Sequence, residues 1–244
     1  YRTSSLYTLI HVLEREGRVW FPRGGTGALV DGLVALFQRH GGVLRAATPV
    51  AQLAVSGQRV TGAIDTHGRT HPADVVVSNA DPLHVYRHWL PNTGTARLWN
   101  RLRSRMKQSM GLFVLYFTTA RRYTELEHHT IVFGESFREI LTDVFDRLTV
   151  PNDLSLYLHR PTATDPAMAP SGRDAFYVLA PVPNLRGGHD WDSLTPALTQ
   201  RILDTLTERL MPDLPTQIRA THAVSPRYFA DELGSPDGAG FSIA

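Results

Sequence analysis

The sequence predicts an α/β or α+β fold, and three observations carry this prediction. Segments with hydrophobic residues at helical spacing alternate along the chain with short apolar or alternating segments of strand length. A glycine-rich loop, residues 24–27, directly precedes one of the helical segments. The 244 residues are 42% hydrophobic and 20% charged, a composition typical of a globular protein with one large domain or two small ones.

The first third of the chain combines helices with a meander of strands. A helix is expected over residues 4–16, with Ser4 or Ser5 as N-cap and Gly17 as its end. A second helix is expected over residues 28–40, ended by the glycine pair that follows it. Strands are then expected at residues 43–45, 48–50, 52–55 and 60–65, separated by turns at 56–58 and 66–69, with a short apolar strand at 74–78 that is suited to burial.

The remainder of the chain again alternates strands with amphipathic helices. A proline- and threonine-rich loop interrupts this pattern at residues 161–172. Nothing repeats at a fixed period. Helices are expected over residues 96–106, 135–148 and 194–211, and strands over residues 111–118, 129–133, 154–158, 175–180 and 218–224.

Composition and charge exclude several classes of protein. The absence of cysteine excludes disulfides, thiolate metal sites and a cysteine nucleophile. No run approaches the roughly 18–20 apolar residues of a membrane-spanning helix. The densest basic stretch, residues 97–107, spreads over more than one helix face and carries no interleaved aromatics, so we expect no nucleic-acid partner. Neither end has a polar tail, so we expect the chain to be a segment of a longer protein.

The loop around Gly24 and Gly25 is a candidate anion site. Such a loop presents backbone N–H groups and a helix N-terminus, both of which favour a pyrophosphate. The loop matches neither the Walker A motif nor the Rossmann fingerprint that directly follows a strand. From the residues alone, a tight structural turn is as good an interpretation as a ligand site.

Eleven histidines raise the question of a metal site. His128 and His129 are adjacent, and we expect them to point to opposite sides of a strand. His84 and His88 have the spacing of two ligands on one helix face, but the glutamate of an HExxH motif is missing. His159 is expected to be a hydrogen-bonded structural residue. The sequence therefore predicts no metal site.

Several segments, in their order along the chain, closely resemble the bacterial phytoene desaturases, which are FAD-dependent members of an amine-oxidase-like superfamily. The resemblance covers essentially the whole chain. The segments that carry it are Ser4 to Ile10, Glu14, Val19-Trp20-Phe21-Pro22-Arg23-Gly24-Gly25-Thr26, Ser78-Asn79-Ala80-Asp81, Leu112 to Phe117, Ser155 to His159 with Thr164-Asp165 and Ala169-Pro170, and Tyr177 to Pro183.

This resemblance implies a partial FAD/NAD(P)-binding Rossmann-like domain plus a substrate domain with a mixed sheet flanked by helices. It assigns residues 1–18 to the end of a helical or substrate region, 19–82 to the central part of the FAD domain, 83–225 to the substrate domain, and 226–244 to the return toward a C-terminal FAD-binding segment. In the family, the valine that matches Val50 pairs through its backbone with the adenine of FAD. The other cofactor-binding residues that the resemblance implies are Gly24, Gly25, Asn79 and Ala80.

The resemblance also implies an activity: FAD-dependent desaturation of a C40 carotene such as phytoene, toward lycopene, in carotenoid biosynthesis. The partners would be a hydrophobic polyene and the cytoplasmic side of a bacterial membrane, bound peripherally; the oligomeric state is left open. The apolar strands at residues 112–117, 154–158 and 176–179 are candidates for tunnel walls or for plain core. The catalytic residues are expected outside this chain, which alone would be inactive. The alternatives are a carotenoid isomerase, a C30 desaturase or a ketolase-like relative on the same scaffold, or a non-catalytic remnant.

Overall fold

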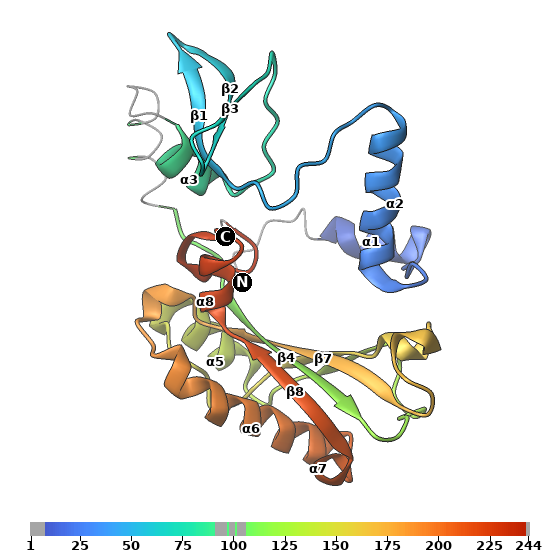
Figure 1. Ribbon diagram of the computed structural model, residues 1–244. Coiled ribbons are helices and arrows are strands. Elements are labelled where there is room, and N and C mark those ends of the chain that lie inside the picture. Colours follow the sequence, from blue (N-terminus) through green and yellow to red (C-terminus); the bar gives the residue numbers. More distant parts are fainter. Residues whose placement is uncertain (1–7, 91–96, 98–100, 102–105, 243–244) are drawn as a thin grey trace.

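The computed structural model describes residues 8–90, 97, 101 and 106–242, and it confirms the combination of helices and sheets (Figure 1). The first part of the chain carries two helices, a small antiparallel sheet and a short helix that continues as a π-helical turn. These elements are α1 (Thr8–Gly17), α2 (Gly25–Arg39), β1 (Val50–Ser56), β2 (Arg59–Asp65), β3 (Thr70–Pro72), α3 (Pro82–His84) and the turn Val85–Trp89.

The second part is built on a larger sheet. Its elements are β4 (Gly111–Thr119), β5 (His129–Val132), α5 (Phe137–Thr142) with the π-helical turn Asp143–Arg147, β6 (Leu156–His159), the 3-10 turns Pro161–Ala163 and Pro166–Met168, β7 (Asp174–Val182), the 3-10 turn Leu185–Gly187, α6 (Trp191–Arg209), α7 (Leu214–Gln217), β8 (Ile218–Val224), α8 (Pro226–Asp231) and the 3-10 turn Pro236–Gly238.

The large sheet has the strand order β5-β6-β7-β4-β8, and every pairing in it is antiparallel. The resemblance implied a mixed sheet with both parallel and antiparallel pairs. The fold class is confirmed, but this sheet has antiparallel pairs only. Strands β7 and β8 both pair with β4 and so run parallel to each other, and α6 and α7 lie in the connection between them. The other connections of this sheet return the chain in the opposite direction. Helices α5 and α6 both lie on the same side of this sheet, and α1 and α2 lie on the other side (Figure 1).

One face of the large sheet forms the core. In β7, buried Phe176, Val178, Ala180 and Val182 alternate with half-buried neighbours, which is the period of two that a one-sided strand requires. Helix α6 begins where Asp190 accepts hydrogen bonds from the amides of residues 192 and 193. Its inward residues complete the core against β4 and β7, namely Trp191, Leu198, Ile202 and Leu206.

Three expected strands are not formed as predicted. Residues 43–45 are irregular, only Val50 of residues 48–50 is in a strand, where it begins β1, and residues 74–78 are irregular and belong to neither sheet. The prediction that residues 74–78 are buried is wrong, since Val75 is 77% and Val77 is 91% exposed. An apolar strand is buried when it lies inside a sheet whose faces are covered by other elements, and no described residues pair with this segment. The N-cap at Ser4 or Ser5 and most of the helix expected at 96–106 lie outside the described residues.

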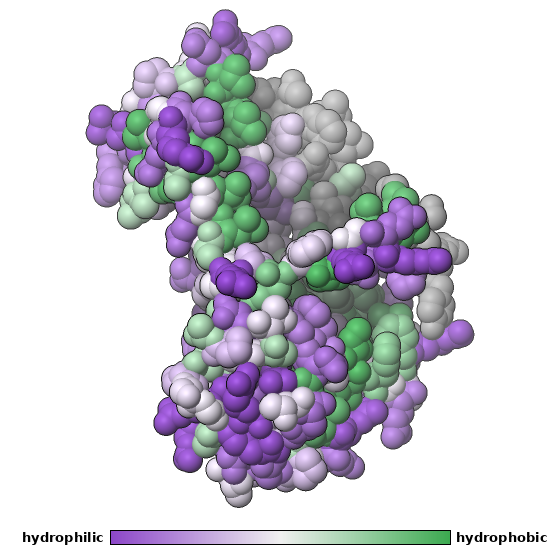
Figure 2. Space-filling view, turned by 90° about the vertical axis from the view of Figure 1, so that its right-hand side faces the viewer, coloured by the Kyte–Doolittle hydropathy of each residue, from purple (hydrophilic) through white to green (hydrophobic). Residues whose placement is uncertain are grey.

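Large hydrophobic side chains reach the surface beside hydrophilic ones in both the upper and the lower part of the molecule (Figure 2). Within the described part of the chain, no helix combines the length and the apolar character needed to cross a bilayer. Many of these exposed hydrophobic residues lie on α1 and α2 and in the segments that flank α2 and β3; among them are Leu13, Val19, Trp20, Leu33, Phe37, Val43, Val75 and Val77.

Candidate functional site: the open face of the large sheet

The sheet face opposite α5 and α6 carries a row of imidazole and phenol rings. Strand pairing aligns His129 with His159, His159 with Tyr177, Tyr177 with Tyr116, and Tyr116 with His222. This row therefore crosses all five strands. Centroids of neighbouring rings lie between 4.4 and 6.2 Å apart. Alternation places these residues on the face away from the core, because their sequence neighbours are the buried ones.

A second row beside the first is mainly apolar. The register aligns Ile131 with Tyr157, Tyr157 with Leu179, Leu179 with Val114, and Val114 with Val224. The two rows together form a broad surface of aromatic and aliphatic side chains with hydroxyl and imidazole groups along one side. The predicted tunnel-wall strands thus divide: alternate residues form the core, and the others form this face.

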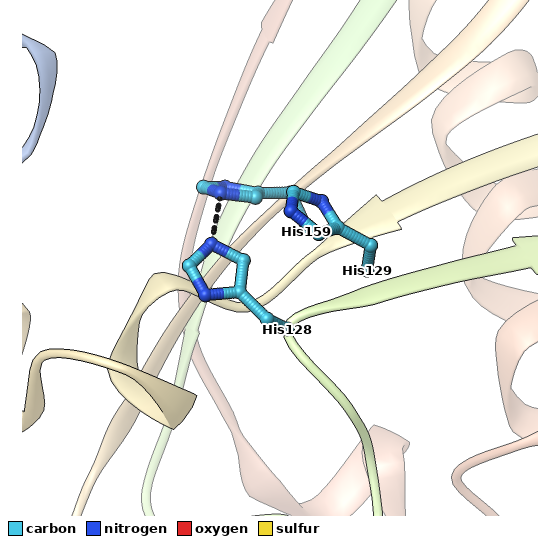
Figure 3. A group of neighbouring side chains, drawn as sticks. All are labelled: His128, His129 and His159. Atoms are coloured by element: carbon cyan, nitrogen blue, oxygen red, sulfur yellow. Dashed lines mark hydrogen bonds between the residues drawn. The ribbon is translucent and has the colours of Figure 1, made fainter. Parts of the chain in front are cut away.

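Three histidines gather at one end of the first row (Figure 3). One ring nitrogen of each of His128, His129 and His159 lies within 4.8 Å of those of the other two. Nε2 of His128 lies 2.7 Å from Nε2 of His159, so one of these nitrogens donates and the other accepts. Hydroxyl groups hold the two outer rings, with Nδ1 of His128 2.5 Å from Oγ1 of Thr164 and Nδ1 of His129 2.6 Å from the oxygen of Tyr157.

The expectation that His128 and His129 point apart is wrong. Their ring centroids lie 4.4 Å from each other. Alternation applies only within a strand, and β5 begins at His129, so His128 sits in the preceding bend and turns toward the same side. His159 is buried as expected and is hydrogen-bonded through Nε2, but its Nδ1 has no hydrogen-bond partner.

Burial and mutual repulsion keep two of these imidazoles neutral. Desolvation is the main cause that lowers the pKa of His159, to about 4, and the neighbouring His128 and His129 add to it. The pKa of His128 is also lowered, first by desolvation and then by the charges of His129 and Arg160. At neutral pH the rings of His128 and His159 therefore present nitrogen lone pairs rather than positive charge.

The segment before α2 packs over the histidine cluster. The ring of Phe21 meets that of His128 edge-on at 4.7 Å and lies 5.9 Å from that of His159. The amide of Gly24 donates to a carboxylate oxygen of Asp165 at 2.7 Å. The glycine-rich loop thus binds the carboxylate of Asp165 from its own chain, which supports the interpretation of the loop as a structural turn. Gly24 and Gly25 both have a positive φ, which favours glycine. A Cβ on Gly25 would also lie 2.9 Å from Cε of Met168.

A buried carboxylate supports the loops around the cluster. Asp174 is fully buried and accepts hydrogen bonds from the amide of Tyr123, from Nε of Arg160 and from the hydroxyl of Thr162. The guanidinium of Arg160 also donates to the carbonyl of Leu126, and the Arg160 amide donates to the carbonyl of His128. Because these bonds join segments far apart in the sequence, they fix the position of the bend that carries His128.

The predicted cofactor residues do not form one cluster. Val50 is the first residue of β1, an edge strand of the small sheet. Asn79 and Ala80 lie just before α3, where the Ala80 amide donates to the hydroxyl of Ser78. Helix α2, which begins at Gly25, stands apart from the small sheet (Figure 1). The cofactor roles of Val50, Asn79, Ala80, Gly24 and Gly25 stay predictions.

Comparison with known proteins identifies the family. Residues 1–229 match the model of the flavin containing amine oxidoreductases. The chain belongs to this family. Two relatives in the family are lycopene-forming phytoene desaturases, from Paracoccus sp. (strain N81106 / MBIC 01143) and from Pseudescherichia vulneris. Each is 43% identical over 244 residues, which are 100% of this chain and 49% and 50% of the respective relative. The chain thus spans about half the length of the curated relatives it matches.

More distant similarities agree with this assignment. A 4,4'-diapophytoene desaturase (4,4'-diapolycopene-forming) from Methylomonas sp is 28% identical over 98% of this chain and 47% of its own length. The crystal structure of an oxidoreductase from Methanosarcina mazei superposes with a TM-score of 0.65 at 15% identity, covering 90% of this chain and 47% of that one. At this identity the superposition shows the fold alone, and it confirms the predicted fold class.

The described residues supply only part of the site that binds the flavin in this family. A dinucleotide site places a glycine-rich turn between a strand and a helix, so that free amides face the pyrophosphate. Here the segment before α2 is not a strand, and the Gly24 amide is already bound by Asp165. Of the predicted cofactor residues, Val50 lies at a strand end, on the edge strand β1, where its backbone could pair with an adenine. The described residues therefore do not fit a complete FAD site by themselves.

Proposed function

We propose that the protein desaturates a C40 carotene in carotenoid biosynthesis as an FAD-dependent oxidoreductase, and that this chain supplies the wall on which the polyene lies. The family membership and the named desaturase relatives support the reaction class. The open face of the large sheet supports the role of this chain. Its two rows provide an extended aromatic and aliphatic surface of the kind that a hydrocarbon without polar groups requires.

The proposed wall explains why the open face is not covered by its own chain. A soluble sheet normally places polar side chains on its uncovered face. Here this face includes Leu179, which is half-buried, and Tyr116 and Ile131, which are exposed. An apolar ligand in contact with this face would remove those side chains from water, with a gain of about 25 cal/mol per Å² of apolar surface.

A carotene substrate implies contact with a lipid bilayer. We propose peripheral attachment to the cytoplasmic side of a bacterial membrane, since the substrate partitions there and no described helix spans a bilayer. Exposed apolar side chains such as Trp20 and Leu13 are compatible with such attachment. Flotation of the full-length protein with vesicles tests this part, and a protein that stays in the aqueous fraction with and without phytoene would refute it.

The experiment that tests the reaction uses the whole open reading frame around this segment. It is expressed in cells that accumulate phytoene, and the pigments are separated by chromatography. Coloured products with longer conjugation are expected, and their spectra count the double bonds formed. Unchanged phytoene in cells that contain the flavin-loaded protein would refute desaturation of this substrate. A product only from the C30 substrate, which the name of the Methylomonas relative suggests, would place the protein with that class.

A matched pair of variants tests the wall. Leu179→Trp adds a large ring in the middle of the open face, whereas Ala197→Trp adds the same ring on the exposed side of α6. We expect Leu179→Trp to reduce phytoene conversion or to stop it at a less desaturated product, because a rigid wall leaves no room for the extra volume. Ala197→Trp should convert phytoene as the unchanged protein does. Equal conversion by both variants would refute the role of the open face.

A further inference from the structure

The three histidines at the end of the first row carry an inference that is independent of the proposed desaturation. We propose that His128, His129 and His159 bind one divalent transition-metal ion of the zinc class, with a fourth position left for water or another ligand. The sequence predicted no metal site. The structure provides three imidazoles from two strands and a bend, with one ring nitrogen of each within 4.8 Å of the others.

The geometry is close to that of a bound metal. Imidazole nitrogens bind Zn²⁺ at about 2.0–2.1 Å, so tetrahedral ligands lie roughly 3.3 Å from one another. The Nε2 atoms of His128 and His159 are 2.7 Å apart. A rotation of the half-buried His128 ring that separates these two atoms by roughly 0.6 Å would admit the ion. The exposed ring of His129 can turn toward the ion without disturbing the core.

The surroundings of the rings match those of metal ligands. In metal sites the second ring nitrogen usually hydrogen-bonds to a fixed group, which orients the ring. Nδ1 of His128 is paired with Thr164, and Nδ1 of His129 is paired with Tyr157, which leaves Nε2 of each for the ion.

A hydrogen-bonded histidine pair does not account for the cluster as well. A proton shared between His128 and His159 gives no role to His129, whose ring lies 5.4 Å from that of His159 and whose Nδ1 is held by the hydroxyl of Tyr157.

The donor set determines which ions fit. The group consists of imidazoles alone. Imidazole suits Zn²⁺, Co²⁺, Ni²⁺ and Cu²⁺, whereas Mg²⁺ and Ca²⁺ require oxygen ligands. Phe21 covers one side of the cluster, so it shields part of the site from solvent. An ion here would join the bend that carries His128 to the adjacent ends of β5 and β6.

The test uses the full-length, flavin-loaded protein without a histidine tag, stripped of metal by chelator and dialysis. Zn²⁺ is titrated by calorimetry, and Co²⁺ is titrated by its visible absorption, which reports tetrahedral coordination. We expect one equivalent of each ion to bind, with no competition from Mg²⁺ or Ca²⁺. His128→Gln and His129→Gln should each weaken Zn²⁺ binding at least ~100-fold, since loss of an outer hydrogen-bond partner alone costs 10–100-fold.

Two further variants make the result specific. His222→Gln changes an exposed histidine in the same row at the opposite edge of the sheet, and it should bind Zn²⁺ as the unchanged protein does. Tyr157→Phe keeps the ring and removes only the hydroxyl that orients His129, so it should weaken binding roughly 10-fold. Circular dichroism without metal confirms that each variant is folded. Absence of stoichiometric Zn²⁺ binding, undiminished binding by His129→Gln, or an equal loss in His222→Gln would overturn the proposal.

Discussion

Replacing Asp174 with asparagine tests the buried network that supports the candidate site. The carboxylate is fully buried and accepts bonds from the Tyr123 amide at 2.7 Å, from Nε of Arg160 at 2.9 Å and from the Thr162 hydroxyl at 2.5 Å. Asparagine has nearly the same shape but directs an NH2 group at one of these donors. It also leaves the charge of Arg160, itself buried, without a counter-ion.

The expected loss of stability follows from this geometry. Breaking a buried ion pair by removal of one partner costs about 3–5 kcal/mol, because the remaining charge stays desolvated. That is a large fraction of the roughly 5–15 kcal/mol that stabilises a typical domain. Asp192→Asn is the matched control, since this carboxylate is 79% exposed and pairs with Arg227 at the surface. An exposed pair contributes at most about 1 kcal/mol.

Urea unfolding of the full-length protein, followed by tryptophan fluorescence, measures both variants. We expect a much lower midpoint for Asp174→Asn than for Asp192→Asn. The double variant Asp174→Asn with Arg160→Met should lose less than the sum of the two single changes, because the unpaired charge is then gone. A midpoint for Asp174→Asn no lower than that of the control would refute the assignment of Asp174 as the anchor of these loops.

Three further predictions concern the scaffold. Ile202→Ala, at a fully buried position of α6, should lower the free energy of unfolding by about 2–5 kcal/mol in urea titrations. Gly62→Ala should destabilise by about 1–3 kcal/mol in the same assay, because φ is 157° and the new Cβ would lie 2.3 Å from a carbonyl oxygen of β3. A Gly68→Ala control also has a positive φ, of 80°, but nothing lies within 4 Å of its Cβ, so it should lose less stability than Gly62→Ala. The amide of Gly24 lowers the pKa of Asp165, and Arg121 lowers the pKa of Asp213. The two carboxylates therefore stabilise the fold fully above their ordinary pKa, and this stabilisation is lost as the pH falls below about 4. A urea midpoint that does not change between about pH 5 and pH 3 would contradict this prediction.

Local periodicity predicted most elements of the fold. The strand expected at residues 218–224 is β8, and the strand expected at residues 175–180 is the central part of β7. The helix expected over 194–211 is α6, which starts three residues earlier because Asp190 caps it. These predictions succeed because burial of one face imposes a period that the sequence shows directly.

Residues 74–78 show where the same reasoning fails. Their apolar composition is that of a buried strand, yet Val75 and Val77 are exposed. Composition states what a segment can bury, but the neighbouring strands decide whether it does. The family comparison is consistent with this, since the relatives extend over about twice the length of this chain.

The sequence by itself determined the family resemblance and most of the helices and strands. Only the tertiary structure decided that His128, His129 and His159 meet, that Asp174 joins loops far apart in the chain, and that Asp165 occupies the glycine-rich turn. The physical reason is that periodicity is a property of neighbouring residues, whereas these contacts depend on strand register and on bends where alternation no longer applies.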